Sequence, residues 1–353
     1  MSAANRRVPT NETRRFAALI TRRESFRKRE ALKHRSTISG LVSLPLPVDV
    51  LHGLDGFASL PSGGALSVGN FDGVHIGHRQ IIDRLRELDR PATTVVTFEP
   101  HPSTVLRRDV PAPRLTPTKL KRERLAEAGV THLVELPPTS EVLSLSPEQF
   151  WEQLSKTAGV SAMVEGGNFR FGKKAAGDVE TLRQLAAGSG VEIQIVEPEL
   201  VTLPGLHRVR ASSTLVRWLM LQGRVADAAA LLGRPFTLRG TVVTGHQRGR
   251  TIGYPTANLD TAEQLLPADG VYSASTTVDG RPYQVALSIG TNPQFDGDRR
   301  QVEAYLLDFS GDLYGREMSV DVHSWLRGQA TFPSFETFLE QMGRDVKRVE
   351  LSA

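Results

Sequence analysis

Two histidines, His75 and His78, stand three residues apart where a glycine-rich turn leads into a run with helical character. Residues three apart on a helix lie on the same face. The start of a helix also presents unpaired backbone N–H groups and the positive end of the helix dipole. Gly69, Gly73 and Gly77 lack the side chains that would keep a bulky anion away from the backbone. The spacing therefore predicts a cradle for a polyphosphate.

The same two histidines could also bind a metal ion. No third ligand is obvious nearby, however, and the chain contains no cysteine, which disfavours a zinc-type site. The full string Gly69-Asn-Phe-Asp-Gly-Val-His-Ile-Gly-His78, which includes Phe71 and Asp72, is much more specific than a lone glycine-rich turn. We therefore favour phosphate binding over a metal site or a purely structural turn.

A second glycine-rich string, Gly166–Gly172, nearly spells a P-loop. In a P-loop the lysine is followed by Ser or Thr, whose hydroxyl binds Mg²⁺. Here Lys173 is followed by Lys174, so we reject a P-loop at this string.

Hydroxyl and basic residues combine further along the chain, where Ser213 and Thr214 stand between Arg210 and Arg217. Taken alone, hydroxyl residues at this place predict the N-terminal cap of a helix. The two arginines could instead clamp phosphate, because guanidinium groups fork onto phosphate oxygens. The histidine signature earlier in the chain favours the phosphate interpretation.

Oxygen ligands suited to Mg²⁺ occur late in the chain, at Thr256 and Asn258. On an extended segment, positions two apart face the same side, so both side chains could reach one ion. Gly253, in the same string, could admit phosphates, although Gly-Tyr-Pro-Thr is also an ordinary turn. Glu303 lies within an apolar strand run and is either a plain outward-facing residue or a functional carboxylate.

Helix and strand patterns alternate through the first half of the chain, which predicts a parallel sheet with helices on both faces. Ligands of such sheets bind beyond the carboxyl ends of the strands, and the histidine signature lies at such an end. Residues 41–64, rich in Pro, Gly and Ser, are expected to lead into the first strand. The expected helices and strands are Gly77–Leu88, Thr93–Phe98, Pro117–Ala128, Thr131–Leu136, Ser146–Ala158, Val160–Glu165, Gly177–Ala187 and Val191–Val196.

From Phe236 onward, short alternating segments replace the strand–helix rhythm, which predicts a small antiparallel barrel followed by an amphipathic helix. With a boundary near Leu232–Pro235, the expected domains are residues 60–232 and 235–353. The expected elements are Thr237–Val243, Gly270–Val278, Tyr283–Ser288, Val302–Phe309 and Glu317–Val322, then a helix over Ser334–Val349.

Composition fits a soluble globular chain of two domains: 353 residues, 39% hydrophobic and 23% charged. No run of eighteen apolar residues is present, so we expect no membrane span. The absence of cysteine excludes a disulfide framework and any thiolate site. We therefore expect a cytoplasmic protein.

The basic charge belongs to the N-terminal segment. Residues 1–40 carry nine Arg and two Lys against three Glu, a charge of +8, so with a total of +4 the remaining residues sum to −4. We expect residues 1–45 to form a basic, disordered extension. Because the rest of the chain is mildly acidic, we expect no nucleic-acid partner.

Taken together, the strings in both halves resemble the bacterial bifunctional riboflavin kinase/FMN adenylyltransferase (FAD synthetase) family. The resemblance implies a nucleotidyltransferase-type, Rossmann-like α/β domain followed by a β-barrel domain. It also implies two reactions: riboflavin and ATP give FMN in the barrel, and FMN and ATP give FAD and pyrophosphate in the first domain. The matching strings are Gly69–His78, Phe98–Pro102, Gly167–Gly172, Ser212–Arg217, Leu232–Pro235, Gly249–Asn258, Ile289–Phe295 and Leu306–Tyr314.

The resemblance also implies roles for single residues. Glu303 corresponds to the catalytic base of the kinase step, with Thr256 and Asn258 holding Mg²⁺ against ATP. Asn168 is implied near the flavin phosphate or the nucleotide. The adenylyl step needs cations and donors for the triphosphate, implied at His75, His78, Ser213, Thr214 and Arg217. The implied ligands are ATP, riboflavin, FMN and FAD. The sequence leaves open whether the protein forms a homo-oligomer.

Other functions remain as alternatives. Gly167 replaces an acidic residue common in the family, and Gln294 replaces a threonine. These departures keep open a riboflavin kinase with a weakened or altered adenylyltransferase half. Two further alternatives are an adenylyltransferase that acts on another phosphate acceptor and a flavin- or nucleic-acid-binding regulator with a basic arm.

Overall fold

The computed structural model describes residues 47–352, apart from 107, 108, 110, 206, 207, 246–253, 263 and 292–299. The basic segment 1–45, Gly253 and Gln294 therefore lie outside the described residues. Within the described part of the chain, no helix is both long enough and apolar enough to cross a membrane.

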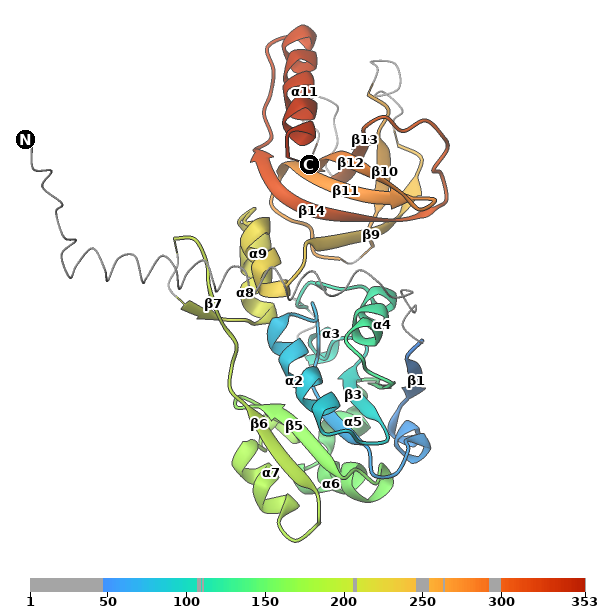
Figure 1. Cartoon of the computed structure of the whole chain (residues 1–353), viewed down its shortest axis with the longest axis vertical. Coiled ribbons are helices and arrows are strands. Elements are labelled where there is room, and N and C mark those ends of the chain that lie inside the picture. Colours follow the sequence, from blue (N-terminus) through green and yellow to red (C-terminus); the bar gives the residue numbers. More distant parts are fainter. Residues whose placement is uncertain are drawn as a thin grey trace, which may run out of the picture. The chain divides into compact units, whose positions relative to one another are not determined.

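The first half of the described chain is an α/β unit (Figure 1). Its elements are β1 (Asp49–His52), a 3₁₀ helix η1 (Leu54–Ser59), β2 (Ala65–Val68), α2 (Ile76–Glu87), β3 (Thr93–Phe98), α3 (Ser103–Leu106), α4 (Thr118–Glu127), β4 (His132–Leu136), α5 (Ser140–Ser144), α6 (Pro147–Glu152), a π-helix η2 (Gln153–Thr157), β5 (Ala162–Gly166), a 3₁₀ helix η3 (Lys173–Ala175), α7 (Val179–Ala186), β6 (Glu192–Val196), β7 (Leu200–Thr202), β8 (Arg208–Arg210), α8 (Ser213–Leu221) and α9 (Val225–Leu232).

Six parallel strands form one sheet in the order β1-β4-β3-β2-β5-β6. Neighbouring residues along a strand alternate between its faces. Val95 accordingly belongs to a buried cluster with Ile82 of α2 on one face, and Val96 belongs to another with Phe57 of η1 and Leu182 of α7 on the other. Both faces are therefore covered, as parallel sheets require.

The order of the strands reverses at β2. The chain moves from β2 to β3 on one side, and β5 later pairs with β2 on its other side. Only Ala65↔Ala162 and Leu66↔Met163 pair between β2 and β5 before the two strands separate. Such a switch point leaves a crevice at the carboxyl ends of the strands, where ligands of open α/β sheets bind.

The second half is a closed antiparallel barrel followed by a helix. In space the strands follow the order β10-β13-β12-β11-β14-β9, and β9 closes the ring by pairing with β10. The elements are β9 (Phe236–Val243), β10 (Ala257–Asp260), β11 (Gly270–Val278), β12 (Arg281–Gly290), β13 (Gln301–Leu306), β14 (Glu317–Arg327) and α11 (Phe335–Glu350). These observations confirm the predicted fold class, a Rossmann-like parallel sheet followed by a small β-barrel.

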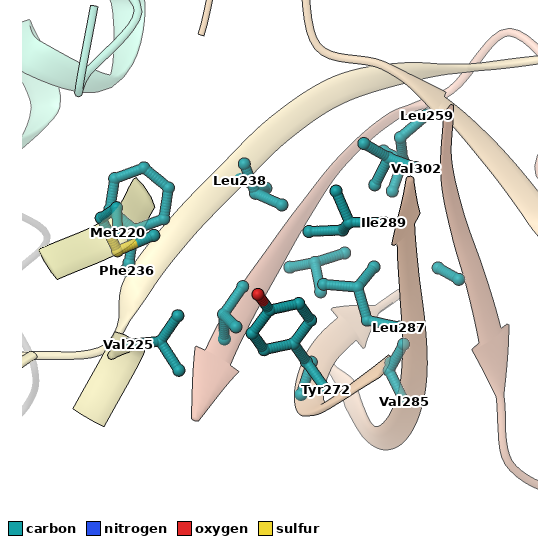
Figure 2. Close-up of a cluster of buried hydrophobic side chains, with 14 of the residues drawn as sticks. Met220, Val225, Phe236, Leu238, Leu259, Tyr272, Val285, Leu287, Ile289 and Val302 are labelled. Atoms are coloured by element: carbon teal, nitrogen blue, oxygen red, sulfur yellow. The ribbon is translucent and has the colours of Figure 1, made fainter. Parts of the chain in front are cut away.

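The core of the barrel continues into the two helices that precede it. Met220 of α8 and Val225 of α9 belong to the same buried cluster as Leu238, Tyr272 and Ile289 of the barrel (Figure 2). The barrel also bonds to the loop before α4, because the Gln264 side chain donates to the Leu115 carbonyl over 2.9 Å. Helices α8 and α9 thus share their core with the barrel.

One local prediction was wrong. Residues 41–64 do more than lead into the first strand, because Asp49–His52 form β1 and pair with β4 at the edge of the sheet. The helix expected over Ser146–Ala158 is present: it begins with the predicted cap and a reciprocal Ser146–Gln149 capping box, and it continues as a π-helix from Gln153 to Thr157. A strand of four residues carries too little periodicity to be recognised.

Candidate functional site

A cavity of about 590 Å³ lies at the switch point between β2 and β5. Its wall includes the ends of both strands, the histidine signature and the start of α8. Ten of the predicted site residues line it: Gly69, Phe71, Asp72, His75, Gly77, His78, Asn168, Ser213, Thr214 and Arg217. Arg210 does not, because it lies exposed on the short strand β8.

The loop between β2 and α2 has an unusual backbone. Phe71, Gly73 and Val74 have positive φ angles of 47°, 83° and 39°. For residues other than glycine this region costs roughly 1–3 kcal/mol each and persists only where the surroundings enforce it. The signature loop is therefore held in a conformation that it would not adopt alone.

Side chains from three other segments hold this loop through its backbone. The Gly73 N–H donates to Thr116 Oγ1 over 2.6 Å, and Ser213 Oγ donates to the Asp72 carbonyl over 2.8 Å. Arg234 donates to the carbonyls of Gly73 and Val74 over 2.7 and 3.0 Å. These bonds offset the strain and fix where the two histidines point.

The carboxylate of Asp72 faces the protein. It accepts hydrogen bonds from the N–H groups of Leu115 and Thr116, each over 3.0 Å, and pairs with the Arg217 guanidinium. Arg217 also donates to the Pro113 carbonyl over 2.8 Å. Asp72 therefore organises the cavity wall and aims Arg217, and its charge is already compensated by these donors.

The two histidines stack against each other, with ring centroids 3.6 Å apart and planes 16° from parallel. The Phe71 ring also contacts His78, with the centroids 4.8 Å apart and the planes tilted by 42°. His75 is the N-cap of α2, and its Nδ1 accepts the His78 N–H over 3.3 Å. His78 Nδ1 is buried and has no hydrogen-bond partner among the described residues, while the residue as a whole lines the cavity.

Both imidazoles are neutral at physiological pH. Burial lowers the pKa of His75 from 6.5 to about 4. Burial, the neighbouring His75 and the positive charges of Lys121 and Arg234 hold the pKa of His78 well below its usual range. In the absence of a ligand, the neutral histidines can therefore donate hydrogen bonds to an anion but carry no positive charge. Among the predicted phosphate-binding residues that line the cavity, the positively charged one is Arg217.

The substitution His75→Asn is expected to reduce the amount by which the free energy of unfolding falls between pH 7 and pH 4. The unfolded chain binds this proton near pH 6.5 but the folded chain only near pH 4, so the free energy of unfolding falls as the pH drops between these values. The gap corresponds to about 3 kcal/mol. Asparagine keeps a cap acceptor, so stability at pH 7 should be retained. Urea unfolding from pH 7 to pH 4 measures the slope, and an unchanged slope contradicts the assignment.

Two glycines of the signature make room for aromatic rings. A Cβ at Gly69 would lie 3.1 Å from the Phe71 ring, and a Cβ at Gly77 would lie 3.3 Å from the His75 ring. The glycines thus allow the rings to pack closely and the backbone to approach a ligand. Ser212 caps α8 through the Leu215 N–H, so the cap expected at this string is present and leaves Ser213 and Thr214 at the cavity.

Two residues that line the larger cavity, Glu165 and His101, were not predicted as site residues from the sequence. Glu165 is the next-to-last residue of β5 and has 2% of its surface exposed, and His101 follows β3 with its Nδ1 2.8 Å from Ser103 Oγ. For Glu165 the available signal was a charged residue at the end of an otherwise apolar strand. His101 lies in the family string Phe98–Pro102 but carries no periodic or charge signal of its own.

A second cavity, of about 120 Å³, lies in the barrel half and is lined by Thr256 and Glu303. Asn258 stands directly opposite Glu303 in the β10–β13 register. Ala257 and Leu259 are buried on the core side of β10, whereas Thr256 and Asn258 are partly exposed on the other side. The two residues thus share one face of the strand, next to Glu303.

The oxygen atoms of Thr256, Asn258 and Glu303 supply part of a ligand set for Mg²⁺. Among the described residues, no group of three or more His, Asp or Glu could hold a metal by itself. A hydroxyl and an amide oxygen beside one carboxylate make an incomplete oxygen set. Mg²⁺ commonly binds such sets together with substrate phosphates and water.

Family models match both halves of the chain. A model described as FAD synthetase covers residues 58–209, and one described as Riboflavin kinase covers residues 232–352. A solved structure of a protein described as a macrolide-efflux protein from Streptococcus pneumoniae superposes with a TM-score of 0.77 at 29% identity, covering 86% of this chain and 99% of that one.

Relatives match over nearly their whole length. The bifunctional riboflavin kinase/FMN adenylyltransferase of Listeria monocytogenes is 34% identical, covering 79% of this chain and 89% of that protein. The protein of the same description from Escherichia coli K12 is 35% identical, covering 84% of this chain and 95% of its own. The chain therefore belongs to the family of bifunctional riboflavin kinase/FMN adenylyltransferases.

Proposed function

We propose that this chain makes flavin cofactors in two steps, with residues 235–353 phosphorylating riboflavin to FMN and residues 60–232 adenylylating FMN to FAD. The observation that carries the proposal is the match of both family models, each over a region that contains most or all of the residues that line one of the two cavities. The substrates are small molecules: riboflavin, FMN and ATP.

In the kinase step, the 5′-hydroxyl of riboflavin attacks the γ-phosphorus of ATP and ADP leaves. A hydroxyl is a weak nucleophile, so a carboxylate that accepts its proton helps the attack. We assign this role to Glu303, because its side chain lines the cavity and it stands opposite Asn258 in the strand register. Thr256 and Asn258 would hold Mg²⁺, which neutralises charge on the phosphates when bound.

In the adenylyl step, the phosphate of FMN attacks the α-phosphorus of ATP and pyrophosphate leaves. The nucleophile is already an anion near neutral pH, so no base is required. The work of the site is to hold the triphosphate and to stabilise charge at the reacting phosphorus. His75, His78 and Ser213 offer donors and Arg217 offers a cation, and Asn168 and Thr214 line the same cavity.

One incubation tests both steps. Purified protein is mixed with riboflavin, ATP and Mg²⁺, and the flavins are separated by chromatography over time. FMN should appear first and FAD afterwards. FMN that accumulates without FAD would leave a riboflavin kinase with a weakened or altered adenylyltransferase half. If no FMN or FAD appears, the incubation is repeated with FMN in place of riboflavin, and FAD formed only then would leave the adenylyltransferase activity alone.

Gly245→Ala is expected to weaken the kinase step selectively. A Cβ at this position would lie 2.1 Å from Asn258 Nδ2, so the amide must rotate away from its place beside Glu303. We expect the KM for Mg²⁺-ATP in FMN formation to rise about tenfold, in line with the loss of a ligand-orienting contact. Conversion of supplied FMN to FAD should not change.

Gly343→Ala is the matched control for this variant. It adds a methyl group in the same half of the chain at an ordinary distance, 3.7 Å from the Tyr254 hydroxyl. Steady-state kinetics of both variants at varied Mg²⁺-ATP decide the point. Equal KM values for the two variants would remove Asn258 from the proposed metal site.

A further inference from the structure

Glu165 lies where the parallel sheet opens. The ladder between β2 and β5 ends with the pair Leu66↔Met163, and the strands then separate. Glu165 is the second residue after Met163 and lines the cavity at this place. Its side chain thus occupies the gap that the missing ladder leaves.

The carboxyl group of Glu165 joins the separated strands. Its Oε1 accepts the Val68 N–H over 2.7 Å, and its Oε2 lies 3.2 Å from Ser67 Oγ. On the other side of β2, the Gly69 N–H donates to the Val96 carbonyl over 2.9 Å. The last residues of β2 are therefore held from both sides, immediately before the signature loop begins.

The groups that form hydrogen bonds to this carboxyl group are neutral. Glu165 is 2% exposed and is paired in the sheet with Ile195 of β6. Burial raises its pKa well above the ordinary value, against the smaller opposing effects of the Val68 N–H and the Ser67 hydroxyl. No cation is among these causes. A neutral acid satisfies both partners, because one oxygen accepts from Val68 and the hydroxyl shares a hydrogen bond with Ser67.

We propose that Glu165 is an uncharged carboxylic acid that positions the phosphate-binding loop for transfer of the adenylyl group to FMN. It replaces the missing ladder bond to Val68 and so fixes the point from which Gly69 to His78 depart. An uncharged group also adds no repulsion to a cavity that must accept a triphosphate and a flavin phosphate. This inference rests on the proposed function of the first domain.

The charge state gives the inference a specific pH dependence. The folded protein keeps a proton that the unfolded chain releases near the ordinary carboxyl pKa. The protonated Glu165 therefore adds to the free energy of unfolding at low pH, and this contribution is lost as the pH rises through the raised pKa. FAD formation by the unmodified protein should fall on the alkaline side as Glu165 ionises.

Glu165→Gln is the decisive variant, because glutamine has the shape of the neutral acid and keeps an acceptor for Val68 and a donor for Ser67. We expect it to convert FMN to FAD within threefold of the unmodified rate at pH 7 and to lose the alkaline decline. Glu165→Ala should lower kcat for FAD formation at least tenfold with a smaller change in KM. FMN formation should stay within twofold in both variants.

Glu180→Gln, on the exposed surface of α7, is the matched control and should leave every rate unchanged. The infrared carbonyl band of a protonated carboxylic acid should be present in the unmodified protein at pH 7 and missing in Glu165→Gln. Loss of activity in a folded Glu165→Gln protein, or absence of that band, overturns the inference. Failure of the unmodified protein to make FAD from FMN would instead overturn the proposed function.

Discussion

Glu303→Gln is expected to lower the rate of FMN formation by about 10²- to 10⁴-fold, the usual contribution of a positioned general base. Glutamine keeps the shape of the side chain on β13 but cannot take the proton of the riboflavin hydroxyl. Supplied FMN should still be converted to FAD at the normal rate, because the other cavity is built from β2, β5 and α8. The measurement is two separate assays, one started from riboflavin and one from FMN.

Glu340→Gln provides the control for this experiment. Its carboxylate lies on α11 with 67% of the side chain exposed, so both rates should remain unchanged. Equal loss of FMN and FAD formation in Glu303→Gln would contradict separate sites. An unchanged rate of FMN formation would show that Glu303 is not the catalytic base.

His78→Ala is expected to produce the reverse pattern, with FAD formation reduced by about 10²- to 10³-fold, the range for loss of one preorganised donor. His78 lines the cavity, so alanine removes a neutral ring that can donate a hydrogen bond to a bound ligand. FMN formation should not change. Single-turnover measurement of FAD formation from FMN separates the chemical step from product release.

Two further variants make this second result specific. His78→Gln keeps a neutral donor and should recover part of the lost rate, since the histidine itself is neutral. His323→Ala removes an exposed barrel histidine that lies 2.8 Å from Ser275 Oγ, and it should change neither activity. If glutamine were as inactive as alanine, charge on the imidazole in the complex would be the better explanation.

The fold was largely predictable because its elements carry strong periodicity. Thr93–Phe98 is a continuous apolar and β-branched run, and it forms β3 with the same bounds. The last helix was expected over Ser334–Val349 and spans Phe335–Glu350, with Ser334 as its cap. Long periodic segments and helix caps are local signals, so no tertiary information is needed to recognise them.

The details of the site were less predictable because they depend on residues far apart in the chain. Asp72 was expected at the ligand, yet its carboxylate bonds to Leu115 and Thr116. Arg234, which holds the strained loop, comes more than 150 residues later than Gly73. The low pKa values of the histidines follow from burial, which the sequence does not display. The histidine spacing identified a loop that lines the cavity, whereas the charge and the hydrogen bonds of this loop are determined by tertiary contacts.

The loop before α4 has a consequence for dividing this protein. Leu115 offers its N–H to Asp72 and its carbonyl to Gln264, and the Leu265 N–H donates to the Arg114 carbonyl over 2.7 Å. A break in the polypeptide between α9 and β9 would leave an apolar surface on α8 and α9 and orphaned amide groups on both fragments. If the gene were split at that point, each of the two encoded proteins would need compensating mutations on this surface to be soluble and to fold as a separate enzyme.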